Sequence, residues 1–400
     1  LGFEANLSNQ QIFASILNRL HSPFLVISVL MEIISYVQIL AIGFYSSISG
    51  LLNENKYTDF LHTFLSIAID FTNIFSKNKD DVKTHTYLIV FFSAIPIIWI
   101  LLYLVFVIEY KVTKSFKPSI IYSLHYIGYH IIFIFSIPMG SYVGFFIRPI
   151  FNDNRNANAI PIFFSLVLLI LIIRIQVFMS ISIHSSPDID IKNRLSFWPQ
   201  NYHPFLYRNV IGFILAILLE FFRDNGDACK IIGYSLIILA GIVGLFILFF
   251  QESNIFPSGK IIISVEYFVL IIAPILSLIY HYSSLHSAYF IVIFIALCVI
   301  FGVSLFFILH HLIKRKVDVL YLPSNELIEQ IDSPKKCIEY IKIGLLYNAP
   351  CVMNHLLLHW ALAKYPTNQE LILFVSYIYY VLHMPYLKIR DLVTIAVDEA

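Results

Sequence analysis

The chain has 400 residues, of which 59% are hydrophobic and 13% are charged, and its formal net charge is +1. Its mean hydropathy is +0.80, whereas a soluble domain has about 45–50% apolar and about 25% charged residues. This composition excludes an ordinary water-soluble protein. The 26 basic residues are spread along the chain, which argues against a nucleic-acid-binding surface. The four cysteines lack the spacing of a zinc site or a disulfide framework, and we expect no cofactor.

Residues 1–23 precede the first long apolar run and predict a short cytoplasmic amphipathic helix over 10–20. The chain begins with Leu1 and ends at Ala400 inside a helical pattern. We therefore expect it to be an excerpt of a longer protein.

Eight apolar runs predict about eight transmembrane helices within a multi-pass region over 24–312. They are 24–46, 87–108, 119–147, 161–183, 205–222, 231–250, 261–280 and 288–312. Helices are required because each backbone amide in hydrocarbon must be paired within its own segment, and no run alternates like a barrel strand. The stretch 61–75 is apolar but too short to span and carries Asp70. It predicts an interfacial amphipathic helix inside a non-cytoplasmic loop, 47–86.

The distribution of Lys and Arg predicts the orientation of these spans. An eight-span arrangement places 11 basic residues on one side, Arg208 among them, and 8 on the other, including Arg148. The positive-inside rule then puts both termini in the cytoplasm. The cluster Lys314, Arg315 and Lys316 follows the last span and predicts an interfacial anchor that favours anionic lipid.

Residues 313–400 have the polar and apolar spacing of helices in water. Caps and prolines mark four predicted helix starts, at Ser333–Pro334, at Pro350, at Thr367 with Glu370 three residues later, and at Pro385. Ser333 and Thr367 are 34 residues apart, which is the period of a tetratricopeptide-type hairpin. The overall expectation is an all-α fold, a polytopic membrane protein followed by a cytoplasmic, TPR-like segment.

Ala361, Tyr365, Pro366, Ser376 and Tyr379 look like the small, proline and aromatic positions of such repeats, although Lys342 stands where a small residue is usual. With the order of its parts, the chain resembles the N-terminal region of large trichomonad multi-pass proteins. Some of these end in PAS and nucleotide cyclase domains, and others carry Tmc-type repeats. The resemblance implies a cytoplasmic output domain beyond Ala400, with a role in signal transduction and cyclic nucleotide synthesis.

Arg174 lies near the middle of the predicted span 161–183. A charge at that depth costs about 2.5–3.5 kcal/mol and needs a partner or water, so we expect it to face the bundle interior. The candidate partners are Glu32, Glu220 and Glu266, with Glu266 and Glu32 preferred. Such a pair is either an ion, proton or ligand site or an interhelical contact that fixes packing. Without a second intramembrane motif, packing is favoured.

Other patterns point to packing more than to chemistry. His125 and His130 share a span with several tyrosines, which favours a hydrogen-bonded seam over a cavity lining. Gly140 and Gly144 form a small-xxx-small pair that allows close helix approach. His355 and His359 have the spacing of a metal pair on a helix but lack the adjacent Glu of a zinc protease.

We find no catalytic motif in the chain. The sequence therefore favours a membrane-anchoring or sensory module that presents a helical-repeat scaffold to the cytoplasm. The alternative is a transporter or channel with a midplane site around Arg174. The expected partners are the lipid bilayer and a protein bound through the repeats, and a homo-oligomer is compatible with this architecture.

Overall fold

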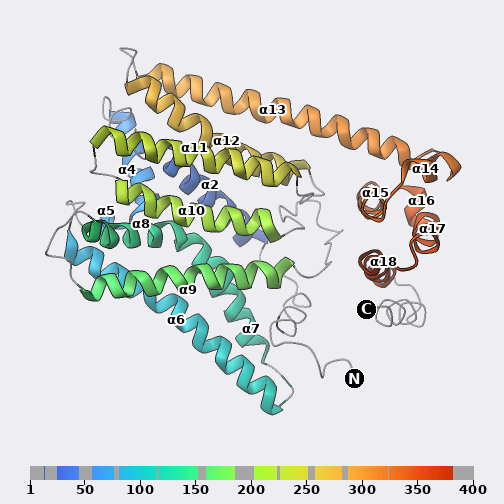
Figure 1. Cartoon of the computed structure of the whole chain (residues 1–400), viewed down its shortest axis with the longest axis horizontal. Helices are drawn as coiled ribbons and strands as arrows, with labels where there is room; N and C mark the ends of the chain where they lie inside the picture. The colour runs from blue at the N-terminus through green and yellow to red at the C-terminus, as the bar shows by residue number, and fades with distance from the viewer. Residues whose placement is uncertain are drawn as a thin grey trace. The chain divides into compact units, whose positions relative to one another are not determined.

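The computed structural model describes residues 25–44, 56–75, 81–113, 117–151, 159–184, 202–222, 226–250, 257–281, 287–322 and 324–381, together with positions 13 and 115. All regular elements in these ranges are helices, and no strand occurs among them (Figure 1). The helix expected over 10–20, apart from Phe13, and the helix expected at Pro385 lie outside the described residues.

The chain divides into two compact units, and one of the boundaries between them falls within a long helix, between Gly302 and Val303. Unit 1 contains α2 (Leu25–Phe44), α4 (Lys56–Ile69), α5 (Thr72–Phe75), α6 (Val82–Thr113), α7 (Pro118–His125), the π-helix η2 (Tyr126–Ile131), α8 (Ile132–Phe151), α9 (Ala159–His184), α10 (Tyr202–Phe222), α11 (Gly226–Phe250), most of α12 (Pro257–His281) and the first part of α13 (Ser287–Leu320). Unit 2 contains the rest of α13 and the later helices.

Six helices in the described ranges are long and apolar enough to cross a membrane. They are Val82–Thr113, Pro118–Arg148, Ile160–Ser182, Ile231–Phe250, Lys260–Tyr280 and Tyr289–Leu320. They coincide with six of the eight predicted spans. The other two, 24–46 and 205–222, fall on α2 and α10, and their crossing of a membrane stays a prediction.

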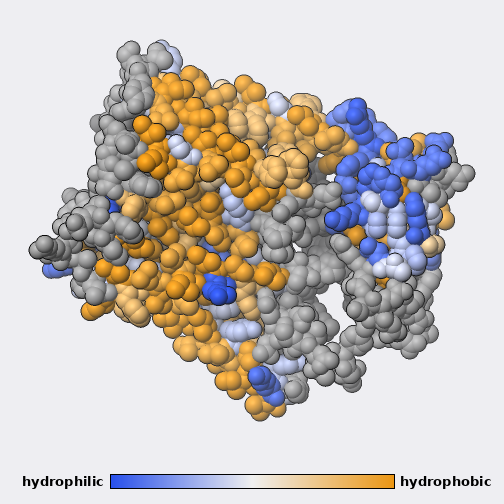
Figure 2. Space-filling model, viewed as in Figure 1, coloured by the Kyte–Doolittle hydropathy of each residue, from blue (hydrophilic) through white to orange (hydrophobic). Residues whose placement is uncertain are grey.

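The spans differ in how much of their surface other helices cover. In Pro118–Arg148, 78% of the most apolar window is buried, against 28% in Val82–Thr113 and 11% in Tyr289–Leu320. The viewed face of unit 1 is therefore broadly hydrophobic in Figure 2. A contiguous apolar surface of this extent is unfavourable in water and fits contact with lipid.

The segment predicted as an interfacial helix is broken and partly buried. α4 ends at Ile69 and α5 begins at Thr72, with Asp70 and Phe71 between them. Leu65 and Ile69 belong to the core of unit 1. One face of the stretch 61–75 therefore packs against the helix bundle, while Phe64, Ile74 and Phe75 are exposed. The helix is broken at Asp70, and its interfacial position stays a prediction.

Unit 2 continues with α14 (Ser324–Gln330), α15 (Pro334–Leu346), α16 (Pro350–Met353), α17 (Leu356–Lys364) and α18 (Gln369–Val381). α15, α17 and α18 share one apolar core with Leu320 at the end of α13.

The local signals that start the helices of unit 2 agree only in part with expectation. Ser333 caps α15 by accepting a hydrogen bond from the Lys336 N–H at 3.3 Å. The cap of α18 is Asn368, whose Oδ1 accepts from the Leu371 N–H at 2.9 Å, and this corrects the predicted capping by Thr367. The helix expected from Pro350 onward is interrupted at His355, which has a φ of 62°.

Candidate functional site

Arg174 does not lie where the sequence predicted. It is exposed on α9 and forms no ion pair or hydrogen bond with any described residue, whereas Gln176, on the opposite face of the same helix, is buried at 4% exposure. A helix places residues two positions apart on opposing faces. α9 therefore turns its neutral amide into the bundle and its arginine outward, against the expectation that the charge faces inward.

The buried arginine of unit 1 is Arg208 on α10. Its Nη2 lies 2.6 Å from Glu266 Oε1 on α12 and 3.1 Å from Ser35 Oγ on α2. The two charged side chains are 4% and 1% exposed. Glu266 is thus paired with Arg208, which corrects the predicted Arg174–Glu266 pair. The arrangement joins three helices through one charge-assisted contact, which is stronger than a neutral hydrogen bond.

Neither of the other two predicted partners is seen to pair with Arg174. Glu220, 1% exposed at the end of α10, lies 3.7 Å from Arg148 Nη1 on α8. Glu32 belongs to α2, but its side chain lies outside the described part of the structure.

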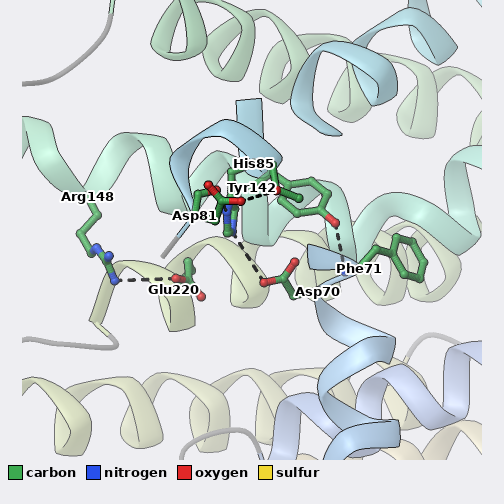
Figure 3. A network of polar contacts seen from close by, with 8 residues as sticks. Asp70, Phe71, Asp81, His85, Tyr142, Arg148 and Glu220 are labelled. Carbon is green, nitrogen blue, oxygen red and sulfur yellow. Dashed lines mark hydrogen bonds and ion pairs between the residues drawn. The ribbon is translucent and has the colours of Figure 1, made fainter. Parts of the chain in front are cut away.

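A second polar network joins the ends of four helices (Figure 3). His85, at the start of α6, places Nδ1 3.0 Å from the Asp81 carbonyl oxygen and Nε2 3.7 Å from the Asp70 carboxylate. A carbonyl oxygen can only accept, so Nδ1–H is the donor and Nε2 is the ring atom that faces Asp70. The His85 ring stacks on the Phe145 ring with centroids 3.8 Å apart. The guanidinium carbon of Arg148 lies 5.5 Å from the centroid of the Phe145 ring.

The backbone break at Asp70 is held by the same network. The Phe71 N–H donates to the Tyr142 hydroxyl at 3.0 Å, and Tyr142 is fully buried on α8. A buried N–H outside a helix needs such a partner. The network therefore fixes the turn between α4 and α5 against α6 and α8.

The predicted small-xxx-small pair explains how Arg148 reaches Glu220. A β-carbon on Gly140 would lie 2.5 Å from the Phe213 carbonyl oxygen, and one on Gly144 would lie 2.6 Å from that of Ile217. α8 and α10 therefore approach too closely for any side chain at these positions. Arg148 follows Gly144 by one turn, so it meets α10 at the next level.

Of the His and Tyr residues in the predicted span 119–147, Tyr129 and His130 lie in the π-helix η2, and His125 is the last residue of α7. His125 stacks on Tyr129 with ring centroids 5.5 Å apart, and His130 is buried beside Tyr129. Gly128 in this segment leaves room for the indole of Trp99, whose Nε1 would otherwise lie 2.4 Å from a β-carbon. These rings stack along one helical segment, and His125 Nδ1 is buried without a hydrogen-bond partner among the described residues, so the predicted hydrogen-bonded seam is not what the structure shows at His125. π-helical turns often occur at functional sites.

The histidine pair and basic cluster predicted in the C-terminal part belong to unit 2. His355 precedes α17, and His359 lies within it; both rings pack on Tyr379. Among the described residues, no group of three or more His, Cys, Asp or Glu side chains could hold a metal ion. Lys316 of the basic cluster pairs with Glu339 on α15, while Lys314 and Arg315 are exposed.

Sequence reasoning missed the buried Arg208 and the partly buried Arg148 because it assigned both to loops, and it did not single out the buried His85. One signal was available: Gly140, Gly144 and Arg148 recur every four residues and share one helix face. Comparison with protein families, with curated proteins and with solved structures gives no match for this chain.

Proposed function

We propose that this chain is a membrane-anchoring, sensory module that presents a helical scaffold to the cytoplasm. The observation that carries the proposal is the continuity of α13, a single helix from Ser287 to Leu320 that contributes to both units. Its apolar part is long enough to span a membrane, and only 11% of its most apolar window is buried. It therefore suits contact with lipid.

The last turn of α13 is built into unit 2. Leu320 is 2% exposed and belongs to the core shared by α15, α17 and α18. The Cys351 thiol donates to the Leu320 carbonyl oxygen at 3.3 Å, and Lys316 pairs with Glu339. A shift of the spanning helix along or about its axis would therefore act directly on the core of the scaffold, which is the property a transmembrane sensor needs.

The full proposal includes eight spans, with α2 and α10 as the remaining two, both termini in the cytoplasm, and unit 2 as a TPR-like docking surface for a protein. Lys314 and Arg315, which are exposed on α13 just after the predicted span 288–312, would contact anionic lipid. A downstream nucleotide cyclase follows only from the resemblance described above. The transporter alternative has less support, because Arg174 is on an exposed face of α9.

Two measurements test the proposal on the full chain expressed with a C-terminal tag. In sealed microsomes the chain should resist carbonate extraction, and added protease should remove the tag without detergent. A tag protected until detergent is added would contradict the cytoplasmic location. Flux through proteoliposomes that is lost in Arg174→Leu would favour the transporter.

A matched pair of variants tests the role of α13. Leu320→Asp places a charge in the core of unit 2 and should make that unit sensitive to limited proteolysis while membrane insertion is kept. Tyr321→Asp is the control, because Tyr321 is 58% exposed. If the two variants are equally resistant, the end of α13 is not part of the scaffold.

A further inference from the structure

A groove between α6 and α9 surrounds the one arginine that the sequence placed near the middle of a span. Its cavity volume is about 310 Å³, and the lining includes Trp99, Tyr103, Leu171, Arg174, Phe178 and Ile181. This volume is at the lower end of the range for small-molecule sites, about 300–1,000 Å³. All its lining residues belong to two helices that are long and apolar enough to span a membrane.

The walls of the groove are fixed before any ligand arrives. Trp99 Nε1–H donates to the Leu124 carbonyl oxygen at 2.9 Å, and the indole stacks on Tyr103 at 5.5 Å with an interplanar angle of 4°. Phe178 packs edge-on against both rings. Phe13, fully buried, contacts Tyr103 and Phe178 from the N-terminal segment. A rigid aromatic wall lowers the entropy lost when a ligand binds.

The positive charge of Arg174 indicates which class of ligand this groove can bind. Arg174 lines the cavity and has no ion-pair or hydrogen-bond partner among the described residues. A guanidinium exposed to hydrocarbon is unfavourable unless an anion or water meets it. A guanidinium also offers paired N–H donors that match phosphate oxygens. The lining from Leu171 to Ile181 extends about 15 Å along α9 at 1.5 Å per residue, which leaves room for both a head group and the start of an acyl chain.

We propose that this groove binds an acidic phospholipid of the bilayer, whose phosphate is drawn inward to Arg174 and whose acyl chain leaves the groove past Leu171 into the hydrocarbon, while Trp99, Tyr103 and Phe178 contact its glycerol and head-group region. Such a lipid supplies the charge that no described residue supplies, and it reaches the groove sideways from the membrane. Lipid binding here is independent of the proposed sensory function, since it requires only unit 1.

The test uses the full chain in nanodiscs and the fluorescence of Trp99, with Trp198→Phe and Trp360→Phe removing the other two tryptophans. Brominated acidic phospholipid should quench Trp99 at about tenfold lower concentration than brominated phosphatidylcholine. Arg174→Gln should abolish this preference. Lys335→Gln, which removes an exposed cation of α15 outside the predicted spans, should retain it.

Three outcomes would overturn the proposal: equal quenching by the two lipids, an unchanged preference in Arg174→Gln, or displacement of the lipid by inorganic phosphate or by a fatty acid at equal concentration. Native mass spectrometry of the unmodified chain gives a second measurement, should the tryptophan variants fold poorly. It should find one acidic phospholipid retained per chain and lost in Arg174→Gln, and retention in that variant would equally refute the site.

Discussion

The buried pair between Arg208 and Glu266 should contribute strongly to stability. The two side chains are 4% and 1% exposed and their atoms lie 2.6 Å apart. Removing one partner of such a pair costs about 3–5 kcal/mol, because the other charge stays buried. In Glu266→Gln, Arg208 keeps its contact with Ser35 Oγ at 3.1 Å, so we expect the free energy of unfolding to fall by about 3 kcal/mol, the lower end of that range.

The assay is titration of the full chain in mixed micelles with dodecyl sulfate, followed by circular dichroism. The double variant Arg208→Met with Glu266→Leu removes both charges and should recover most of the loss, since apolar replacements of buried pairs are often neutral. Glu109→Gln is the control, because its partner Lys117 is 74% exposed, and it should cost under about 1 kcal/mol. A double variant no more stable than Glu266→Gln would refute the reasoning.

Three further predictions concern packing, reactivity and topology. Gly144→Ala should lower the free energy of unfolding by about 1–3 kcal/mol, because its β-carbon would lie 2.6 Å from the Ile217 carbonyl oxygen; Gly302→Ala would meet its nearest atom at 3.6 Å and should be neutral in the same titration. Cys337 is fully buried, and burial raises the pKa of its thiol to about 12, so mass spectrometry should find it alkylated at pH 8 only after unfolding; labelling of the folded chain would contradict this. An engineered acceptor within 47–86 should be glycosylated in microsomes while native Asn6 is not, and the reverse pattern would invert the topology.

Hydropathy predicted most of the spans because their boundaries depend only on the length and composition of each apolar run. The same criterion could not foresee the break at Asp70. That turn depends on Tyr142, 71 residues later, whose hydroxyl receives the Phe71 N–H. Local sequence does not contain the partner, so propensity alone favours a continuous helix over 61–75.

The cap of α18 was misplaced by one residue for a local reason. Thr367 with Glu370 satisfies the capping-box pattern, yet Asn368 caps at least as well as threonine and its Oδ1 receives the Leu371 N–H. Thr367 and Asn368 are adjacent, and both are residue types that cap helices. The pattern indicated that a helix begins there but left its first residue open within the usual uncertainty of helix ends.

Charge partners were the least predictable feature, because pairing depends on how each helix is rotated about its own axis. Hydropathy barely constrains that rotation in α9, which is apolar on all sides except at a few residues such as Arg174 and Gln176. Arg208 and Arg148, counted as loop charges on opposite sides, are instead paired with Glu266 and Glu220. Removing one charge from each side leaves the difference between the two sides unchanged. The predicted orientation therefore survives the loss of both arginines from the count, and it depends on the lysine-rich clusters beside the spans.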